Sequence, residues 1–181
     1  RFYSATKSFT AAAVLEQVAQ GNWSLDDHLG KHLTTITNPN IDTTVTLHQL
    51  LTHQTGFPDY TYDDDVAFRV IYDGVNGNFV YDPLAIMNDT DYVDPPLFAP
   101  GTDAQYSSTN YILLGLAMEN LPEIDSIEHH FRTNLLDPAG MIETAFYPAE
   151  PVTGDTPAPH DELSQYGLQA VYPDSVVPGE I

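Results

Sequence analysis

The sequence predicts one unit built mainly from α-helices and long loops. Apolar residues recur at helical spacing in several segments, which begin at capping residues and end at glycine or proline. The alternation of apolar and polar residues that is typical of strands is rare along the chain. A chain of 181 residues is long enough to bury one hydrophobic core.

The expected helices share a capping residue or an acidic first turn at their start. Thr46 and Ser126 are side chains of the type that accepts a hydrogen bond from the first turn, and Ser4 is the expected N-cap of the first helix. Asp82 combines an acidic N-cap with a proline at the first helical position. The expected helices cover residues 4–20, 47–53, 63–74, 111–121 and 126–136, with another that begins at Asp82.

The segments between these helices predict loops. Residues 34–44 are polar and contain a proline, and residues 57–104 are rich in Asp, Tyr, Pro and Gly apart from their two short helices. A long segment with little regular structure inside a compact domain is usually functional or mobile. From residue 148 onward the chain is rich in proline, and residues 171–181 have an extended pattern.

The composition excludes several classes of function. The chain has 26 Asp and Glu against 5 Lys and Arg, a formal net charge of −21, so binding to nucleic acid or to an anionic membrane surface is not expected. The chain has no cysteine, which excludes a thiol nucleophile, a disulfide framework and a Cys-ligated zinc. No apolar run approaches the ~18 residues of a membrane helix. High acidity with scarce lysine suggests a saline or extracytoplasmic setting, with an ordinary acidic protein as the alternative.

The strongest chemical motif is Ser4-Ala5-Thr6-Lys7. Positions i and i+3 share a helix face, so the Lys7 amine is expected beside the Ser4 hydroxyl. A serine needs a neighbouring base to act as a nucleophile, and a lysine serves where its surroundings lower its pKa. The alternative is a capping serine followed by a solvated lysine.

Three later segments accompany this motif in the chain: Leu50-Leu51-Thr52-His53-Gln54-Thr55-Gly56-Phe57-Pro58, the stretch from Pro100 through Tyr106-Ser107-Ser108 to Gly115, and Leu136-Asp137-Pro138-Ala139-Gly140-Met141. Together with residues 1–10 they resemble, in order, four segments of the serine β-lactamase and penicillin-binding-protein superfamily, and in particular of its class C-related group of D,D-peptidases, esterases and amide hydrolases. These are the nucleophile segment, a Leu-Leu-Thr-His-x-Ser-Gly segment, the second active-site motif with its helix, and a Pro-Leu-Gly-Met turn.

The resemblance implies a role for each matching residue. Ser4 is the expected acylated nucleophile, and Lys7 helps to deprotonate it. Tyr106 is expected to carry protons to and from Ser4, and the Ser4 backbone N–H supplies half of an oxyanion hole. Ser108 is the expected substrate-binding residue, at the position where the family commonly has Asn; a serine is shorter and lacks the amide's paired donor and acceptor, and Asn110 lies two residues too late to replace it.

The implied fold is α+β and β-lactamase-like, of which residues 1–181 are expected to form mainly the helical region. We expect the family's first strands to precede Arg1, and its third motif, with the second oxyanion donor, to follow Ile181, so the chain is predicted to be an internal fragment. The fragment alone is expected to be inactive.

The function implied for the intact protein is serine acyl transfer to water. The substrate is a small molecule or peptide, namely an ester, an amide, a D-amino-acid peptide or a β-lactam, and no cofactor or metal is implied. The negative charge favours an esterase or peptidase over a dedicated β-lactamase, because β-lactams carry a carboxylate. The expected localisation is extracytoplasmic, and the oligomeric state is left open. One alternative is a non-catalytic β-lactamase-like binding module, which Ser108 favours.

Two acidic clusters suggest metals, each with a plainer interpretation. Asp27, His28 and His32 have the spacing of a partial zinc site, but Gly30 interrupts the helix and no third ligand is obvious. An acidic calcium-binding module is the other alternative, with its ligands at Asp89, Asp91 and Asp94. That loop lacks the glycine and the terminal glutamate of a helix–loop–helix site, so a solvated acidic loop is favoured.

Three other histidines also have structural interpretations. His129 and His130 are neighbours on one helix and point to different faces, so at most one of them is expected to be buried. His53 lies near a helix end and is interpreted as a hydrogen-bonded structural histidine rather than a base.

Overall fold

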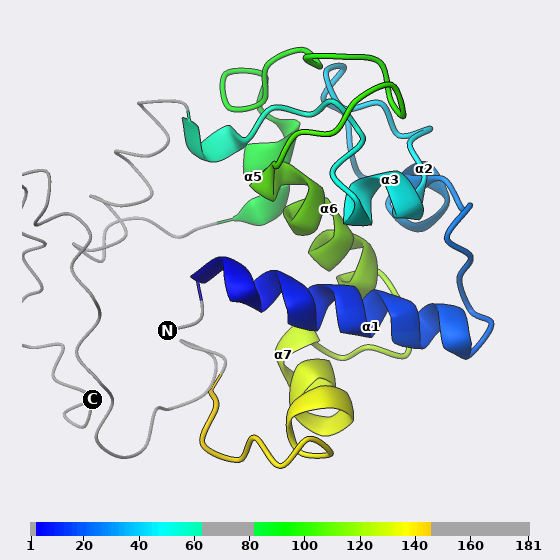
Figure 1. The fold of residues 1–181 in the computed structure, drawn as a ribbon, viewed down its shortest axis with the longest axis vertical. Coiled ribbons are helices and arrows are strands. Elements are labelled where there is room, and N and C mark those ends of the chain that lie inside the picture. The colour runs from blue at the N-terminus through cyan, green and yellow to red at the C-terminus, as the bar shows by residue number, and fades with distance from the viewer. Residues whose placement is uncertain (1–2, 63–81, 146–181) are drawn as a thin grey trace, which may run out of the picture.

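The computed structural model describes residues 3–62 and 82–145, and the statements below concern these ranges. Within them the chain is helical, as the sequence predicts (Figure 1). The elements in chain order are η1 (Tyr3–Thr6), α1 (Lys7–Ala19), α2 (Leu29–His32), α3 (Leu47–Leu51), η2 (Tyr60–Tyr62), α5 (Pro83–Asn88), α6 (Ser108–Glu119), α7 (Ile127–His130) and η4 (Phe131–Leu136). The helix predicted at 63–74 and the extended segment predicted at 171–181 lie outside the described residues.

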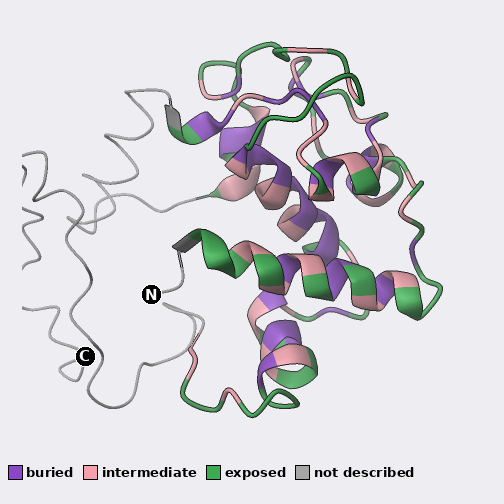
Figure 2. Ribbon diagram, viewed as in Figure 1, coloured by how far each residue is buried: buried purple, intermediate pink, exposed green. Residues whose placement is uncertain are grey.

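Helix α6 is the centre of the core. It packs against α1, α3 and α5 and also touches α2, α7 and η2. Figure 2 shows buried positions alternating with half-buried ones along the helix, in agreement with a sequence that is apolar almost all round. The helix begins at Ser108, three residues before the predicted start, because polar groups of another loop satisfy its first turn. Its fully buried side chains are Thr109, Asn110, Leu113, Leu114, Ala117 and Met118.

The first helix is nearly as predicted, but its start differs. A 3₁₀ turn (η1) contains Ser4, and the α-helical part begins only at Lys7, with Thr6 as N-cap and no side-chain capping bond. The expectation that Ser4 caps this helix is therefore wrong, since the Ser4 hydroxyl lies against Tyr106 instead. Gly21 follows the helix with a φ of +79°, which confirms the predicted stop.

The other predicted caps are confirmed. Thr46 and Gln49 form a reciprocal capping box at the start of α3. Asp82 accepts hydrogen bonds from the backbone N–H groups of the two residues after Pro83, and Ser126 accepts one from the His129 backbone. These short helices therefore begin where local side-chain chemistry specifies.

Strand structure is nearly absent from the described ranges. They hold one isolated antiparallel bridge, between His28 and Thr46. The expectation of few strands in this part of the chain is confirmed.

Helix α1 is joined to the last helical segments by Glu16. The Glu16 carboxylate lies 3.0 Å from the Nε2 atom of buried His130 and accepts a hydrogen bond of 3.0 Å from Asn134. His129 is exposed, so the expectation that at most one of the two adjacent histidines is buried is confirmed. Figure 1 shows α7 and α6 on different sides of α1.

Residues 53–56 lie along residues 97–105 and bring the site segments together. The carbonyl oxygens of His53, Gln54 and Gly56 accept hydrogen bonds from the backbone N–H groups of Gln105, Gly101 and Leu97. Gly56 has a φ of +81°, and a Cβ atom there would lie 2.1 Å from the carbonyl oxygen of Phe98. This close backbone approach requires glycine.

We expect Gly56→Ala to destabilise the protein more than Gly21→Ala. The two glycines have nearly equal φ angles, but a Cβ at Gly21 meets nothing within 4 Å. Gly21→Ala should cost ~1 kcal/mol of unfolding free energy through backbone strain alone. Gly56→Ala adds the backbone clash and should cost ~3 kcal/mol in urea denaturation. Equal losses of unfolding free energy in the two variants would show that the backbone at Phe98 can move away from a Cβ at position 56 at little cost.

Candidate active site

Four side chains predicted from the sequence meet where η1 and α1 pass the start of α6. The Ser4 Oγ atom lies 2.6 Å from the Tyr106 hydroxyl, and either oxygen can be the donor. The Lys7 amine donates to Ser4 Oγ at 3.4 Å and to Ser108 Oγ at 3.3 Å. The same amine lies 4.8 Å from the centre of the Tyr106 ring. Ser4 and Tyr106 come from segments 102 residues apart, so the tertiary fold creates this cluster.

Local helical geometry accounts for the pairing of Ser4 with Lys7. The 3₁₀ turn and the first turn of α1 are continuous, so side chains three positions apart lie on one face. Ser4 is exposed and Lys7 is half-buried. The nucleophile candidate therefore faces solvent, while the amine lies against the protein.

The N-terminus of α6 is held by a loop that sequence reasoning did not single out. Buried Asp59 accepts a hydrogen bond of 2.8 Å from the Ser108 backbone N–H. The Pro58 carbonyl oxygen accepts one from Ser107 Oγ and another from Thr109 Oγ1. This capping from a distant loop explains why Ser107, the N-cap residue, makes no capping bond of its own. The only signal in the sequence for this role of Asp59 was its position as an acidic residue directly after the family-like segment 50–58.

The departure at Ser108 has a defined geometry. Its hydroxyl oxygen contacts the Lys7 amine, so a polar atom does face the lysine from this position. Asn110 points elsewhere: it is fully buried, and its Oδ1 atom accepts a hydrogen bond of 2.7 Å from Thr55. Asn110 therefore does not replace the asparagine that the family commonly has at the position of Ser108.

His53 adjoins the cluster. Its Nδ1 atom accepts a hydrogen bond of 3.2 Å from the Ser107 backbone N–H, which agrees with the expectation of a hydrogen-bonded histidine. The same nitrogen lies 3.2 Å from the side-chain nitrogen of Asn110. The ring packs against Tyr106 with 4.8 Å between ring centres.

The electrostatics of the cluster act on Tyr106. Burial is the largest single influence and by itself raises the pKa of the Tyr106 hydroxyl. Interactions with Lys7, Ser4 and Ser108 favour the phenolate and together outweigh burial. The net pKa of Tyr106 lies below the ordinary tyrosine value, so this hydroxyl loses its proton more readily than a solvated tyrosine does.

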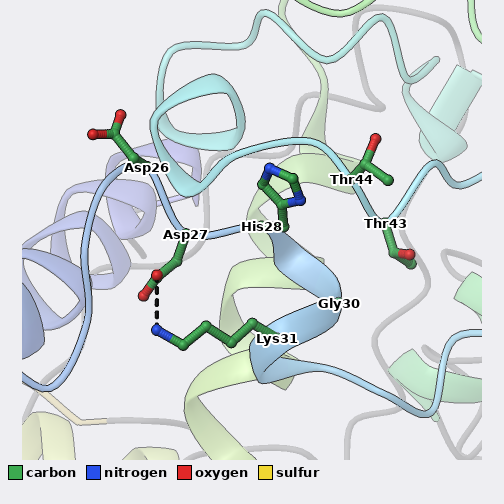
Figure 3. A pocket seen from close by; sticks show the side chains of 7 residues that line it. All are labelled: Asp26, Asp27, His28, Gly30, Lys31, Thr43 and Thr44. Atoms are coloured by element: carbon green, nitrogen blue, oxygen red, sulfur yellow. Dashed lines mark hydrogen bonds and ion pairs between the residues drawn. The ribbon is translucent and has the colours of Figure 1, made fainter.

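The two acidic clusters that suggested metal sites have plainer roles in the structure. In the first cluster, Asp27 pairs with neighbouring side chains. Asp27 accepts from Lys31 at 2.8 Å and contacts His32 at 2.9 Å. The pKa of the Asp27 carboxyl is lowered, first by Lys31 and next by the Ser24 backbone. Figure 3 shows the open hollow beside them, where Lys31 reaches Asp27. Among the described residues no group of at least three His, Asp or Glu side chains could hold a metal ion.

The calcium hypothesis falls on an exposed loop after α5. Asp89, Asp91 and Asp94 are all exposed, and the Asp89 carboxylate accepts a hydrogen bond from the Asp91 backbone N–H. This arrangement is typical of a turn that an aspartate stabilises by itself.

Comparison with known proteins identifies the family. A family model described as Beta-lactamase matches residues 1–175. The chain belongs to the β-lactamase family. The described residues form the mainly helical part of this β-lactamase-like fold, as the resemblance implied.

Relatives with solved structures match most of the chain. A D-stereospecific amidohydrolase from Streptomyces sp. is 26% identical with a TM-score of 0.69, over 85% of this chain and 45% of that protein. An octameric penicillin-binding protein homologue from Pyrococcus abyssi is 30% identical with a TM-score of 0.64, over 83% of this chain and 33% of that one.

A curated relative gives the same result by sequence. Protein flp of Staphylococcus aureus (strain COL) is 31% identical over 146 residues. The match covers 79% of this chain and 27% of that protein, so the chain spans about a quarter of its relative.

We expect Lys7→Met to raise the pKa of Tyr106 toward the ordinary value of ~10, because the cation beside the phenolate is lost. The measurement is a phenolate absorbance titration, with Tyr106→Phe to identify the band. Lys31→Met removes the chain's other lysine, which pairs with Asp27, and should leave the band unchanged. The same change of the Tyr106 titration in both lysine variants would contradict a specific contact between Lys7 and Tyr106.

We also expect Asp59→Ala to lower the unfolding free energy by ~2 kcal/mol, because it leaves the part-buried backbone N–H of Ser108, at the start of α6, without its acceptor. Exposed Asp103, which accepts only from its neighbour's backbone N–H among the described contacts, is the matched control. Asp103→Ala should change stability by less than ~0.5 kcal/mol in the same urea titration.

Proposed function

We propose that the protein is a serine hydrolase that works through an acyl-enzyme on Ser4. The observation that carries this proposal is the 2.6 Å contact between Ser4 Oγ and a tyrosine hydroxyl whose pKa is lowered beside Lys7. A serine becomes nucleophilic when such a neighbour accepts its proton. The family and its amidohydrolase and penicillin-binding-protein relatives support a hydrolase of this general type.

In the proposed reaction Tyr106 carries the proton in both directions. Ser4 Oγ attacks the acyl carbon while its proton passes to the Tyr106 oxygen, and the resulting tetrahedral intermediate collapses as Tyr106 returns that proton to the leaving group. Water then attacks the acyl-enzyme and gives a proton to the Tyr106 oxygen, and Tyr106 passes that proton to Ser4 Oγ as the bond between Ser4 and the acyl group breaks and the acid product is released. Lys7 stabilises the ionised form of Tyr106, and Ser108 orients the Lys7 amine.

The negative charge on the tetrahedral oxygen needs donors in fixed positions. The Ser4 backbone N–H is the first proposed donor, since it belongs to the turn that carries the nucleophile. The second belongs, in the same proposal, to the strand that bears the family's third motif.

The proposed substrates are esters, amides or peptides with a D-amino acid, and β-lactams are less favoured. The relative with the TM-score of 0.69 is named as a D-stereospecific amidohydrolase, which supports the amide class. The net charge of −21 disfavours an anionic substrate unless salt screens the field. β-Lactams and D-Ala peptides both carry a carboxylate, so a neutral ester or amide fits this charge best.

A non-catalytic binding module remains the second candidate, on the ground of Ser108. A serine lacks the paired donor and acceptor of the amide that commonly orients the substrate at this position. Hydrolysis of a simple ester by the intact protein separates the two candidates.

The proposed setting is outside the cytoplasm, in a periplasmic or secreted protein. None of the helices in residues 3–62 and 82–145 is both long enough and apolar enough to cross a bilayer.

The test is covalent labelling of the intact protein by a serine-directed fluorophosphonate. We expect the label on Ser4, because its hydroxyl is exposed and contacts both Tyr106 and Lys7. Ser4→Ala should abolish labelling and ester hydrolysis, whereas Ser8→Ala removes an exposed serine one turn further along and should change neither. Undiminished labelling of Ser4→Ala would refute the nucleophile assignment.

A further inference from the structure

His53 has a backbone conformation that is unusual for a residue with a side chain. Its φ is +60°, and no other non-glycine residue in the described ranges has a positive φ. It follows the end of α3, where glycine is the common residue. Backbone strain of this kind persists where contacts of the same residue stabilise it, and it is common at functional sites. The contacts of the His53 side chain are therefore the relevant ones.

The contacts of the ring define its protonation state. A backbone N–H can only donate, so the Nδ1 atom that faces the Ser107 N–H at 3.2 Å acts as an acceptor and carries no proton. The side-chain nitrogen of Asn110 faces the same atom at 3.2 Å. In this arrangement the imidazole is therefore neutral, with its hydrogen on Nε2.

His53 holds Tyr106 through both its ring and its backbone. The rings of His53 and Tyr106 lie 4.8 Å apart, and the ring of Tyr111 lies 5.2 Å away from His53. Tyr111 is anchored by its hydroxyl, which donates to the Leu51 carbonyl. The His53 carbonyl oxygen also accepts from the backbone N–H of Gln105, the residue before Tyr106. Because Tyr106 is 44% exposed, its orientation depends on a small set of neighbours such as this one.

The charges around His53 make protonation unfavourable. The titratable groups that face it are Lys7 at the start of α1, Asp59 in the loop before η2, Tyr106 before α6 and Tyr111 on α6. Burial lowers the pKa of His53 most, and the positive charge of Lys7 lowers it further, while Asp59 opposes them. A proton on Nδ1 would also oppose the Ser107 N–H.

We propose that His53 is a positioning residue for proton transfer at Ser4, because its neutral ring holds the Tyr106 hydroxyl against Ser4 Oγ and its protonated ring releases it. This role rests on the proposed acyl-transfer function. Activity is then present while His53 is neutral and is lost as the pH falls through its pKa. That loss should occur below the ordinary histidine range near ~6.5.

The first test uses His53→Asn in the intact protein. Asparagine tolerates a positive φ and offers a side-chain acceptor, but it has no ring and does not titrate. We expect kcat for a neutral ester to fall by about tenfold, part of the ~100-fold or more that general acid–base catalysis contributes, with KM little changed. The loss of activity on the acidic side that wild type shows should disappear from the variant's pH profile.

His53→Gly separates positioning from a purely structural role. Glycine relieves the backbone strain at position 53. If His53 had only a structural role, His53→Gly should melt at a temperature no lower than that of His53→Asn and should keep the wild-type kcat. Positioning predicts that kcat falls in His53→Gly even though the variant is folded. Wild-type kcat in both variants would overturn the proposal.

A second readout does not depend on activity. In His53→Asn the phenolate titration of Tyr106, identified with Tyr106→Phe, should move toward the ordinary tyrosine value, because the hydroxyl leaves Lys7 and Ser4. An unchanged titration would overturn the positioning role. If wild type neither labels at Ser4 nor hydrolyses esters, the proposed function fails, and the titration still decides whether His53 positions Tyr106.

Discussion

The hydrogen bond from the Ser108 backbone to buried Asp59 is the constraint on which the site depends. Helix α6 carries six fully buried residues, its first turn carries Ser108, and Tyr106 lies just before it. An uncapped N-terminus would leave backbone donors unsatisfied in a partly buried place, which costs free energy. Asp59 supplies the acceptor for the Ser108 backbone N–H, and the Pro58 carbonyl accepts from the side-chain hydroxyls of Ser107 and Thr109, so the loop after residue 53 is joined to the start of α6. One interaction therefore stabilises the core helix and places two site residues.

The site combines Ser4 and Lys7, which lie on one helical turn, with Tyr106, which tertiary contacts position against them. Ser4 and Lys7 are related by helical geometry alone, and they form one side of the cluster. Tyr106 comes from a turn, and its place is set by the backbone pairing of residues 53–56 with 97–105 and by the ring of His53. The close approach at Gly56 allows that pairing. Chemistry that needs a 2.6 Å contact thus depends on packing several residues away from the reacting atoms.

The charge of Lys7 affects the protonation of Tyr106 and of His53. In a strongly acidic chain a lysine without a carboxylate partner among the described ion pairs is unusual, and Lys7 instead faces two serine hydroxyls and a tyrosine ring. Its charge favours ionised Tyr106 and disfavours a protonated His53. The first effect populates the form of Tyr106 that can accept the Ser4 proton in the proposed reaction, and the second keeps His53 in its neutral form.

The sequence by itself determined the helical character, the caps at Thr46, Asp82 and Ser126, and the pairing of Ser4 with Lys7, because these depend on neighbours within one helical turn. Motif order also indicated Tyr106 and Ser108. Local patterns wrongly gave Ser4 a capping role and started α6 three residues late, since the competing partners, Tyr106 and Asp59, lie 102 and 49 residues away in the chain. Only the tertiary structure decided that Asp59 caps α6, that Asn110 turns to Thr55, and that His53 supports Tyr106 as a neutral ring. Such long-range contacts leave no periodic signal in the sequence, because they depend on how separate elements pack around the core.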